Sequence, residues 1–168
     1  SGITFDANGD MYVVDTMNHR VQKFTVDGKF ISTFGSYGDG DGQFNMPWGI
    51  GIDPNDGAIV IGDWRNDRVQ KFSSEGEYLL QFGTSGSERG QLNRPAGVTI
   101  DGHSDIYVAD RGNHRVQLFN TAGEFVDVFL GDAVLSKSGR TYIMANPKVL
   151  RSREDIDHVD VKRLRGVM

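Results

Sequence analysis

Apolar and polar positions alternate with a period of two along most of the first 131 residues, and this pattern predicts short β-strands. Four strands are expected in the middle of the chain, at residues 49–52, 58–62, 68–72 and 77–82. The second strand is apolar at nearly every position, which is typical of a strand covered on both faces. Clusters of Asp, Asn, Pro, Ser and Gly separate these strands and predict tight turns.

The same set of four strands is expected twice more in the chain. The first set covers residues 3–5, 11–14, 20–24 and 29–34, and the last covers 98–100, 106–109, 115–119 and 124–129. A common sequence, Asp-x-x-Asn-x-Arg-Val-Gln-x-Phe, starts at Asp15, Asp63 and Asp110, so that the copies lie 48 and 47 residues apart. A repeat of this length predicts units that bury their apolar faces against their neighbours.

A unit of four antiparallel strands with an apolar inner strand is typical of a β-propeller blade. The units are expected at residues 1–48, 49–96 and 97–131. Together with Gly-Ile-x-x-Asp at the start of a unit and Phe-Gly at its end, the common sequence resembles the NHL repeat over residues 2–131. This resemblance implies an all-β chain forming part of an NHL-type propeller, which usually has six blades.

Six blades at this spacing would need roughly 280 residues, and the chain has 168. An arc of three blades would expose apolar faces at both ends. We therefore expect a fragment of a longer protein, with the remaining blades in the missing part. The alternative is that two copies of the chain close a ring together.

The repeat stops after Gly131. Asn146-Pro147 resembles a helix start, with Asn as the N-cap and Pro at the first helical position. We expect a short C-terminal helical insertion between blades at residues 132–160, with residues 161–168 as the truncated start of another blade.

Charge and composition exclude some functions and weaken others. Residues 1–131 carry 10 Lys/Arg and 18 Asp/Glu, a formal charge of −8, whereas residues 132–168 carry +3. An acidic repeat region disfavours nucleic-acid binding, which needs a basic footprint. The absence of cysteine excludes disulfides and thiolate metal sites. No apolar run approaches the roughly 18 residues of a membrane span, no signal peptide is recognisable, and the compartment stays undetermined.

The repeated carboxylate and guanidinium pairs are expected to be scaffold, because a catalytic group need not recur in every blade. These pairs are Asp15 with Arg20, Asp63 with Arg68, and Asp110 with Arg115. His19, Asp67 and His114 occupy one repeated position, but the position leads away from the propeller axis and does not favour a metal site. Asp39-Gly40-Asp41-Gly42 lacks the ligand spacing of a calcium loop and predicts a flexible link. No catalytic motif is recognisable, so neither an enzyme nor a cofactor is expected.

The second-to-third strand turns and the links between blades emerge on one face of the propeller, which we call the long-loop face. Long loops on a rigid scaffold commonly carry binding residues. Non-repeating residues on this face are the candidate ligand-binding residues: Asn45, Trp48, Trp64, Arg65, Arg94 and Arg111. The alternative for Trp48 and Trp64 is packing between blades.

The sequence favours a non-catalytic scaffold that binds a protein, peptide or carbohydrate over the long-loop face. Nucleic-acid binding is the first alternative, because the resemblance includes animal NHL propellers that bind RNA and Arg65, Arg94 and Arg111 form a local basic group. The second alternative is part of a metal-dependent propeller lyase or hydrolase. The resemblance includes a lyase that processes amidated peptides, but its metal-binding His set is not recognisable in this chain.

Overall fold

A computed structural model describes residues 2–130, which lie in the first of two compact units, Ser1–Gly131. The helical insertion expected at 132–160 and the further blade expected at 161–168 lie outside the described residues. Within residues 2–130 no helix is long and apolar enough to cross a membrane.

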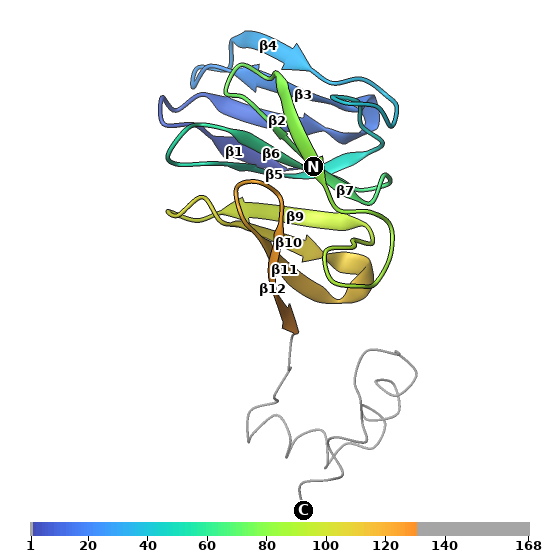
Figure 1. Cartoon of the computed structure of the whole chain (residues 1–168). Coiled ribbons are helices and arrows are strands. Elements are labelled where there is room, and N and C mark those ends of the chain that lie inside the picture. The colour runs from blue at the N-terminus through green and yellow to red at the C-terminus, as the bar shows by residue number, and fades with distance from the viewer. Residues whose placement is uncertain (1, 131–168) are drawn as a thin grey trace, which may run out of the picture. The chain divides into compact units, whose positions relative to one another are not determined.

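The described residues form three four-stranded antiparallel sheets, each ordered as its strands occur in the chain (Figure 1). We call these sheets blade 1, blade 2 and blade 3. Blade 1 contains β1 (Ile3–Phe5), β2 (Met11–Asp15), β3 (Arg20–Phe24) and β4 (Phe30–Phe34). Blade 2 contains β5 (Pro47–Ile52), β6 (Ile59–Asp63), β7 (Arg68–Phe72) and β8 (Tyr78–Phe82). Blade 3 contains β9 (Pro95–Ile100), β10 (Ile106–Asp110), β11 (Arg115–Phe119) and β12 (Phe125–Leu130).

The all-β, four-stranded architecture predicted from the sequence is confirmed. The third strand of every blade has the predicted bounds, because its alternation begins directly after a sharp turn. The first strands of blades 2 and 3 start earlier than predicted, at Pro47 and Pro95, since proline is tolerated as the first residue of a strand. Two 3₁₀ turns, η1 (Thr16–Asn18) and η2 (Arg111–Asn113), lie between second and third strands.

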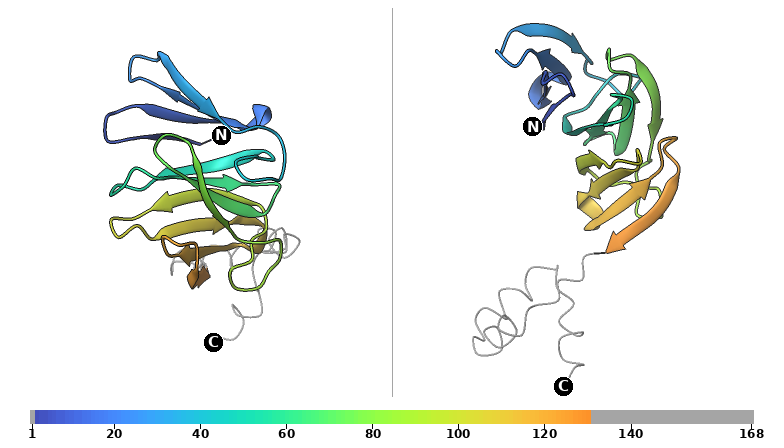
Figure 2. Two further views of the ribbon diagram at one scale, coloured as in Figure 1. Left: turned by 45° about the horizontal axis from the view of Figure 1, so that its top comes forward. Right: turned by 90° about the vertical axis from the view of Figure 1, so that its left-hand side faces the viewer.

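The first strands of neighbouring blades lie side by side: β1 contacts β5, and β5 contacts β9. In the right-hand view of Figure 2 the blades fan out from this inner edge, with β4, β8 and β12 on the outside. Glycine makes the close approach possible, because a Cβ added to Gly49 would lie 2.5 Å from the Ala96 carbonyl oxygen. At the other junction, a Cβ on Gly2 would lie 2.8 Å from the Trp48 carbonyl oxygen.

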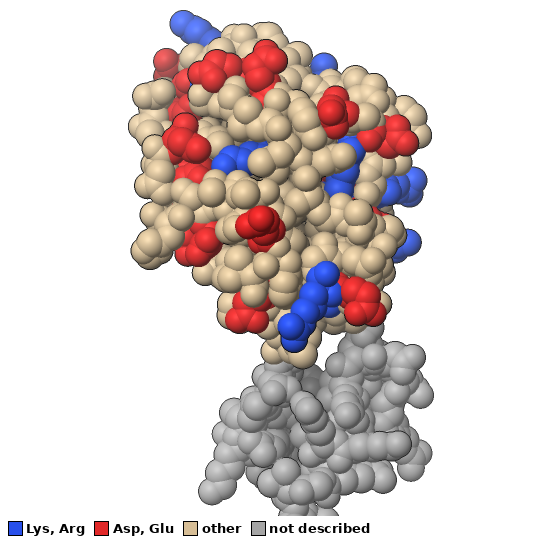
Figure 3. Space-filling model, in the orientation of Figure 1, with Lys and Arg blue, Asp and Glu red and all other residues tan. Residues whose placement is uncertain are grey.

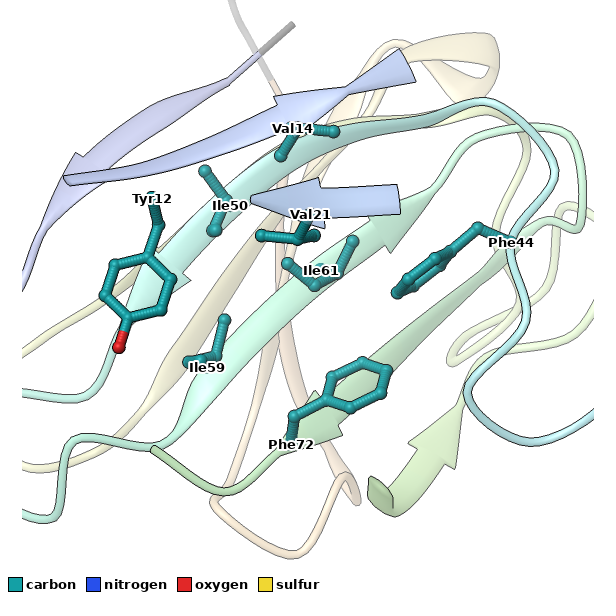
Figure 4. Close-up of a cluster of buried hydrophobic side chains, with 8 residues drawn as sticks. All are labelled: Tyr12, Val14, Val21, Phe44, Ile50, Ile59, Ile61 and Phe72. Atoms are coloured by element: carbon teal, nitrogen blue, oxygen red, sulfur yellow. The ribbon is translucent and has the colours of Figure 1, made fainter. Parts of the chain in front are cut away.

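Each junction between blades has its own apolar core, and β6 contributes to both. Ile59 and Ile61 face blade 1, whereas Val60 between them faces blade 3, as the two-residue period of a strand requires. Figure 4 shows the first core, where side chains of blade 1 meet those of blade 2. Its members are Tyr12, Val14, Val21, Phe44, Ile50, Ile59, Ile61 and Phe72. The continuous apolar character of β6 therefore reflects burial on both faces.

The links between blades are folded loops, contrary to the flexible link expected at Asp39–Gly42. Phe44 and its counterpart Leu92 are fully buried in the junction cores. The Gln43 side-chain oxygen accepts the Gly40 N–H at 3.1 Å, and the Gln70 side-chain oxygen accepts the Gly42 N–H at 3.0 Å. The second of these bonds could not be read from the link alone, because Gln70 belongs to the following blade.

Candidate functional site on the long-loop face

A buried polar network around Asp63 anchors the link between blades 1 and 2. One carboxylate oxygen of Asp63 accepts the Asn45 N–H at 2.8 Å. The other accepts Asn66 Nδ2 at 2.8 Å and Arg68 Nε at 3.0 Å. Burial raises the pKa of Asp63, and the bonds from Asn45, Asn66 and Arg68 act in the opposite direction. A buried carboxylate of this kind needs each of these donors.

Arg68 extends the network to the main chain of the link. Its terminal nitrogens donate to the carbonyl oxygens of Asp39, Gly40 and Gln43 at 2.6, 2.9 and 2.9 Å. Blade 3 repeats the arrangement, with Arg115 donating to the carbonyls of Ser87, Glu88 and Gln91. The structure thus places these predicted pairs where they hold the links.

The repeated His/Asp position forms a second anchor for each link. His19 Nδ1 accepts the Met46 N–H at 3.0 Å, and Asp67 accepts the Arg94 N–H at 2.7 Å. Asp67 also accepts the Ser85 hydroxyl at 2.7 Å. Among residues 2–130, no group of three or more His, Cys, Asp or Glu side chains is placed to hold a metal ion.

An aromatic and arginine cluster lies beside these anchors, and we call it the Trp–Arg cluster: Trp48, Trp64, Arg65 and Arg94. The two indole rings are tilted against each other with centroids 5.7 Å apart. The guanidinium carbons of Arg65 and Arg94 each lie 5.5 Å from the Trp64 ring, within cation–π range. Trp48 retains 42% of its accessible surface, so part of the cluster faces solvent.

The cluster borders a surface hollow of about 410 Å³ lined by Asn45, Trp64, Arg65, Asp67 and Arg94. The structure therefore brings five of the six predicted ligand-binding residues together, from β5, the β6–β7 turn and both links. Arg111 lies in η2 of blade 3 and is not among the residues lining this hollow. Asp67 was missed as a lining residue; the replacement of His by Asp at the repeated position was the available signal.

Side chains of the cluster do not recur in the other blades. The residue equivalent to Trp64 is Thr16 in blade 1 and Arg111 in blade 3. The Thr16 hydroxyl donates to the Pro47 carbonyl at 2.8 Å. The Trp64 Nε1–H is buried and has no acceptor among residues 2–130. The cluster is thus a local addition to a repeated framework.

Acidic and basic side chains are interspersed on the face drawn in Figure 3, and no continuous basic stripe crosses it. This distribution agrees with the formal charge of −8 over residues 1–131. A phosphate backbone would find no extended basic track on this face.

The family model described as "NHL repeat" matches residues 1–24, 44–72 and 92–119. The chain is an NHL-repeat protein. Each matched stretch ends with the third strand of a blade, and the two later ones begin within a link, at Phe44 and Leu92.

Three similar proteins illustrate how far the likeness extends. Protein brain tumor of Drosophila melanogaster is 38% identical over 61 residues, which is 36% of this chain and 6% of that protein. Virginiamycin B lyase from Staphylococcus aureus superposes with a TM-score of 0.61 at 20% identity, over 79% of this chain and 41% of the lyase. The RRP9 WD40 repeats superpose with a TM-score of 0.64 at 13% identity, over 79% of this chain and 38% of theirs.

The NHL chain therefore spans about two fifths of these solved structures and a small part of protein brain tumor. At these identities the likeness to the lyase and to the WD40 repeats concerns the propeller fold alone.

Proposed function

We propose that this NHL-repeat segment is a non-catalytic scaffold that binds a protein or peptide through the Trp–Arg cluster. The observation that carries the proposal is the exposed Trp48 ring, packed against a Trp64 ring that two arginines flank. Neither Arg65 nor Arg94 forms an ion pair within residues 2–130. Aromatic and arginine residues are the types that most often dominate binding energy in protein interfaces.

The chemistry of the cluster favours a peptide that combines an apolar side chain with a carboxylate. The indole rings offer apolar area at low cost in side-chain entropy, since each has two rotatable bonds. The guanidinium groups lie on the Trp64 ring, which restricts their motion before a ligand arrives. A guanidinium held in this way can donate two parallel hydrogen bonds to one carboxylate.

Single-stranded RNA is the second candidate, because bases can stack on exposed indole rings beside arginine. The formal charge of −8 over residues 1–131 disfavours it. Filter binding of a random-sequence RNA oligonucleotide at about 50 and 200 mM salt separates the two candidates. Retention that falls steeply with salt would support RNA binding and contradict the peptide proposal.

Tryptophan fluorescence gives a direct test, because both tryptophans of the chain belong to the cluster. Peptides selected from a random display library on the wild-type chain should change the tryptophan emission when titrated. Trp48→Ala and Arg94→Ala should each weaken binding of the selected peptides at least about tenfold, the effect expected for a binding hot spot. Arg89→Ala is the matched control, since Arg89 is an exposed arginine of the same link outside the hollow.

Selected peptides that bind the Trp48→Ala and Arg94→Ala variants as well as the wild type would refute the proposal. Failure to select any peptide would also count against it. The circular dichroism spectrum of each variant should match that of the wild type, so that loss of binding reports on the cluster rather than on folding.

A further inference from the structure

His19 and Asp67 occupy the same repeated position but offer the links different acceptors. His19 ends η1 in the left-handed conformation, with a φ of 55°, and its Nδ1 accepts the Met46 N–H at 3.0 Å. Asp67 has a φ of 51° and accepts the Arg94 N–H at 2.7 Å. The two anchors therefore share one backbone geometry and differ in the atom that accepts the hydrogen bond.

The residues that these anchors hold are also in the left-handed conformation. Met46 has a φ of 55°, and Arg94 has a φ of 54°. Residues other than glycine adopt this conformation rarely, and they keep it only where their surroundings hold it. The hydrogen bond from the Met46 N–H to His19 is thus one of the contacts that keep the first link in its conformation.

The peptide group between Asn45 and Met46 connects His19 with the Trp–Arg cluster. Its N–H donates to His19, and its carbonyl oxygen accepts the Arg65 N–H at 3.0 Å. Arg65 follows Trp64 directly in the chain, and its guanidinium carbon lies 5.5 Å from the centre of the Trp64 ring. A rotation of this peptide group would remove the acceptor of the Arg65 N–H. His19 and the main chain of the cluster are thus joined through a single peptide group.

Protonation of the His19 ring would remove the acceptor of the Met46 N–H. A neutral imidazole has one nitrogen that accepts and one that donates, whereas both nitrogens of the charged form donate. Because Nδ1 of His19 faces the Met46 N–H, protonation would place two donors against each other. Histidine is the side chain that titrates between about pH 5 and pH 8, and a carboxylate keeps its acceptor oxygens over this range.

The charged residues on the turn of His19, on the link that it holds and on the neighbouring β6–β7 turn are Asp15, Arg20, Asp39, Asp41, Arg65 and Asp67. The link also places Tyr37 against the His19 ring, with ring centroids 4.9 Å apart. Within residues 2–130 no carboxylate forms an ion pair with His19. A proton gained by His19 would therefore meet no carboxylate partner at the ring.

We propose that His19 is a proton-sensitive anchor of the Trp–Arg cluster: protonation of its ring releases the Asn45–Met46 peptide group and changes the conformation of the cluster. The second link, which Asp67 holds, keeps its conformation over the same pH range. The consequence for binding rests on the proposed function of the cluster. A ligand that fits the present arrangement of Trp48 and Trp64 binds the released form less tightly.

Nuclear magnetic resonance of the ¹⁵N-labelled chain tests the release without any ligand. Between about pH 7.5 and pH 5.5, where imidazole titrates, the Met46 and Arg65 amide resonances should shift together with the ring nitrogens of His19. The Arg94 amide resonance should move far less, because Asp67 remains its acceptor. Tryptophan emission should change over the same range, since both tryptophans of the chain belong to the cluster.

His19→Asp is the variant that isolates the anchor, because it gives the first link the acceptor that Asp67 gives the second. It should abolish the pH dependence of the Met46 amide and of the tryptophan emission. His103→Gln is the matched control, since it removes an exposed histidine from the β9–β10 turn and should leave both pH dependences unchanged. A Met46 amide that does not respond to pH in the wild type, or that responds equally in His19→Asp, would overturn the proposal.

A histidine-free peptide selected on the wild-type chain gives the second measurement. From about pH 7.5 to pH 5.5 its affinity for the wild type should fall about three- to tenfold, the size of one lost hydrogen bond, and its affinity for His19→Asp by less than about twofold. Equal falls for both chains would contradict the regulation of the cluster by His19. If no peptide is selected, the proposed function fails, while the resonances and the emission still decide whether His19 is the anchor.

Discussion

Replacing Arg68 by alanine should destabilise the fold far more than the same change at Arg20, although both residues belong to the same repeated motif. Arg68 lies within a buried network, and its loss leaves the Asp63 carboxylate without its cation and removes one donor from each of three link carbonyls. Breaking a buried ion pair by removing one partner costs about 3–5 kcal/mol. Arg20 pairs with a partly exposed Asp15, and exposed pairs contribute about 0.2–1 kcal/mol.

Urea unfolding followed by circular dichroism measures the difference. With a slope of about 2 kcal/mol per molar urea, Arg68→Ala should lower the midpoint by about 1.5–2.5 M and Arg20→Ala by no more than about 0.5 M. Arg115→Ala should resemble Arg68→Ala, because Asp110 and Arg115 are equally buried. Tryptophan emission reports on the cluster of blade 2, so coincidence with the circular dichroism transition tests whether the blades unfold together.

Equal losses of stability for Arg68→Ala and Arg20→Ala would refute this reasoning, because they would show that burial of an Asp–Arg ion pair does not set its contribution to stability. A near-neutral Arg68→Ala would refute it as well. Arg89→Ala serves as the control for the removal of an exposed arginine and should change the midpoint by no more than the error.

Three further predictions follow from the junctions and from the turn of blade 1. Gly49→Ala should cost at least about 1–3 kcal/mol in urea unfolding, because the new Cβ would lie against the Ala96 carbonyl, whereas Gly102→Ala, with open space around it, should stay within about 0.5 kcal/mol. Phe44→Ala should cost about 3–5 kcal/mol by leaving a cavity in the first core, measured in the same way. Partial burial acts to raise the pKa of Asp6, but bonds from Lys23 and from the N–H groups of Asp10 and Asn8 outweigh it and hold the pKa below its ordinary 3.8. Asp6 therefore stabilises the fold above about pH 4 and loses this contribution as the pH falls through its lowered pKa, so Asp6→Asn should lose less stability than the wild type between about pH 5 and pH 3.

The strands could be predicted from the sequence because their signals are local. Alternation, turn residues and the repeated motif all lie within one unit, so β3, β7 and β11 were predicted to the residue. The start of β5 at Pro47 was missed because pairing with Asp63 of the same sheet extends the strand through a register shift.

Features that depend on contacts between distant residues could not be predicted in the same way. The conformation of Asp39–Gly42 is fixed by Arg68 and Gln70, which follow almost thirty residues later. The contribution of Asp67 to the hollow depends likewise on its bond to the Arg94 N–H across the following link. Trp64 and Arg65 were identified as candidates because they differ from the residues at the same positions of the other repeats. Arg111 meets the same criterion but lies in another blade. A difference between repeats does not say which residues lie close together in space.

Hydrogen bonds to the main chain connect the Trp–Arg cluster to the repeated Asp63 and Asp67 positions. The conformation of the links therefore does not depend on which side chains the cluster carries. Asp63 fixes the Asn45 N–H, the Asn45 carbonyl accepts the Arg65 N–H at 3.0 Å, and Asp67 fixes the Arg94 N–H. None of these bonds uses the side chains of Trp48, Arg65 or Arg94. Side chains at these positions can therefore change while the links keep their conformation, whereas a change at Asp67 would alter the hollow and the link together. A propeller built in this way can vary the side chains of its long-loop face blade by blade without altering the strands beneath.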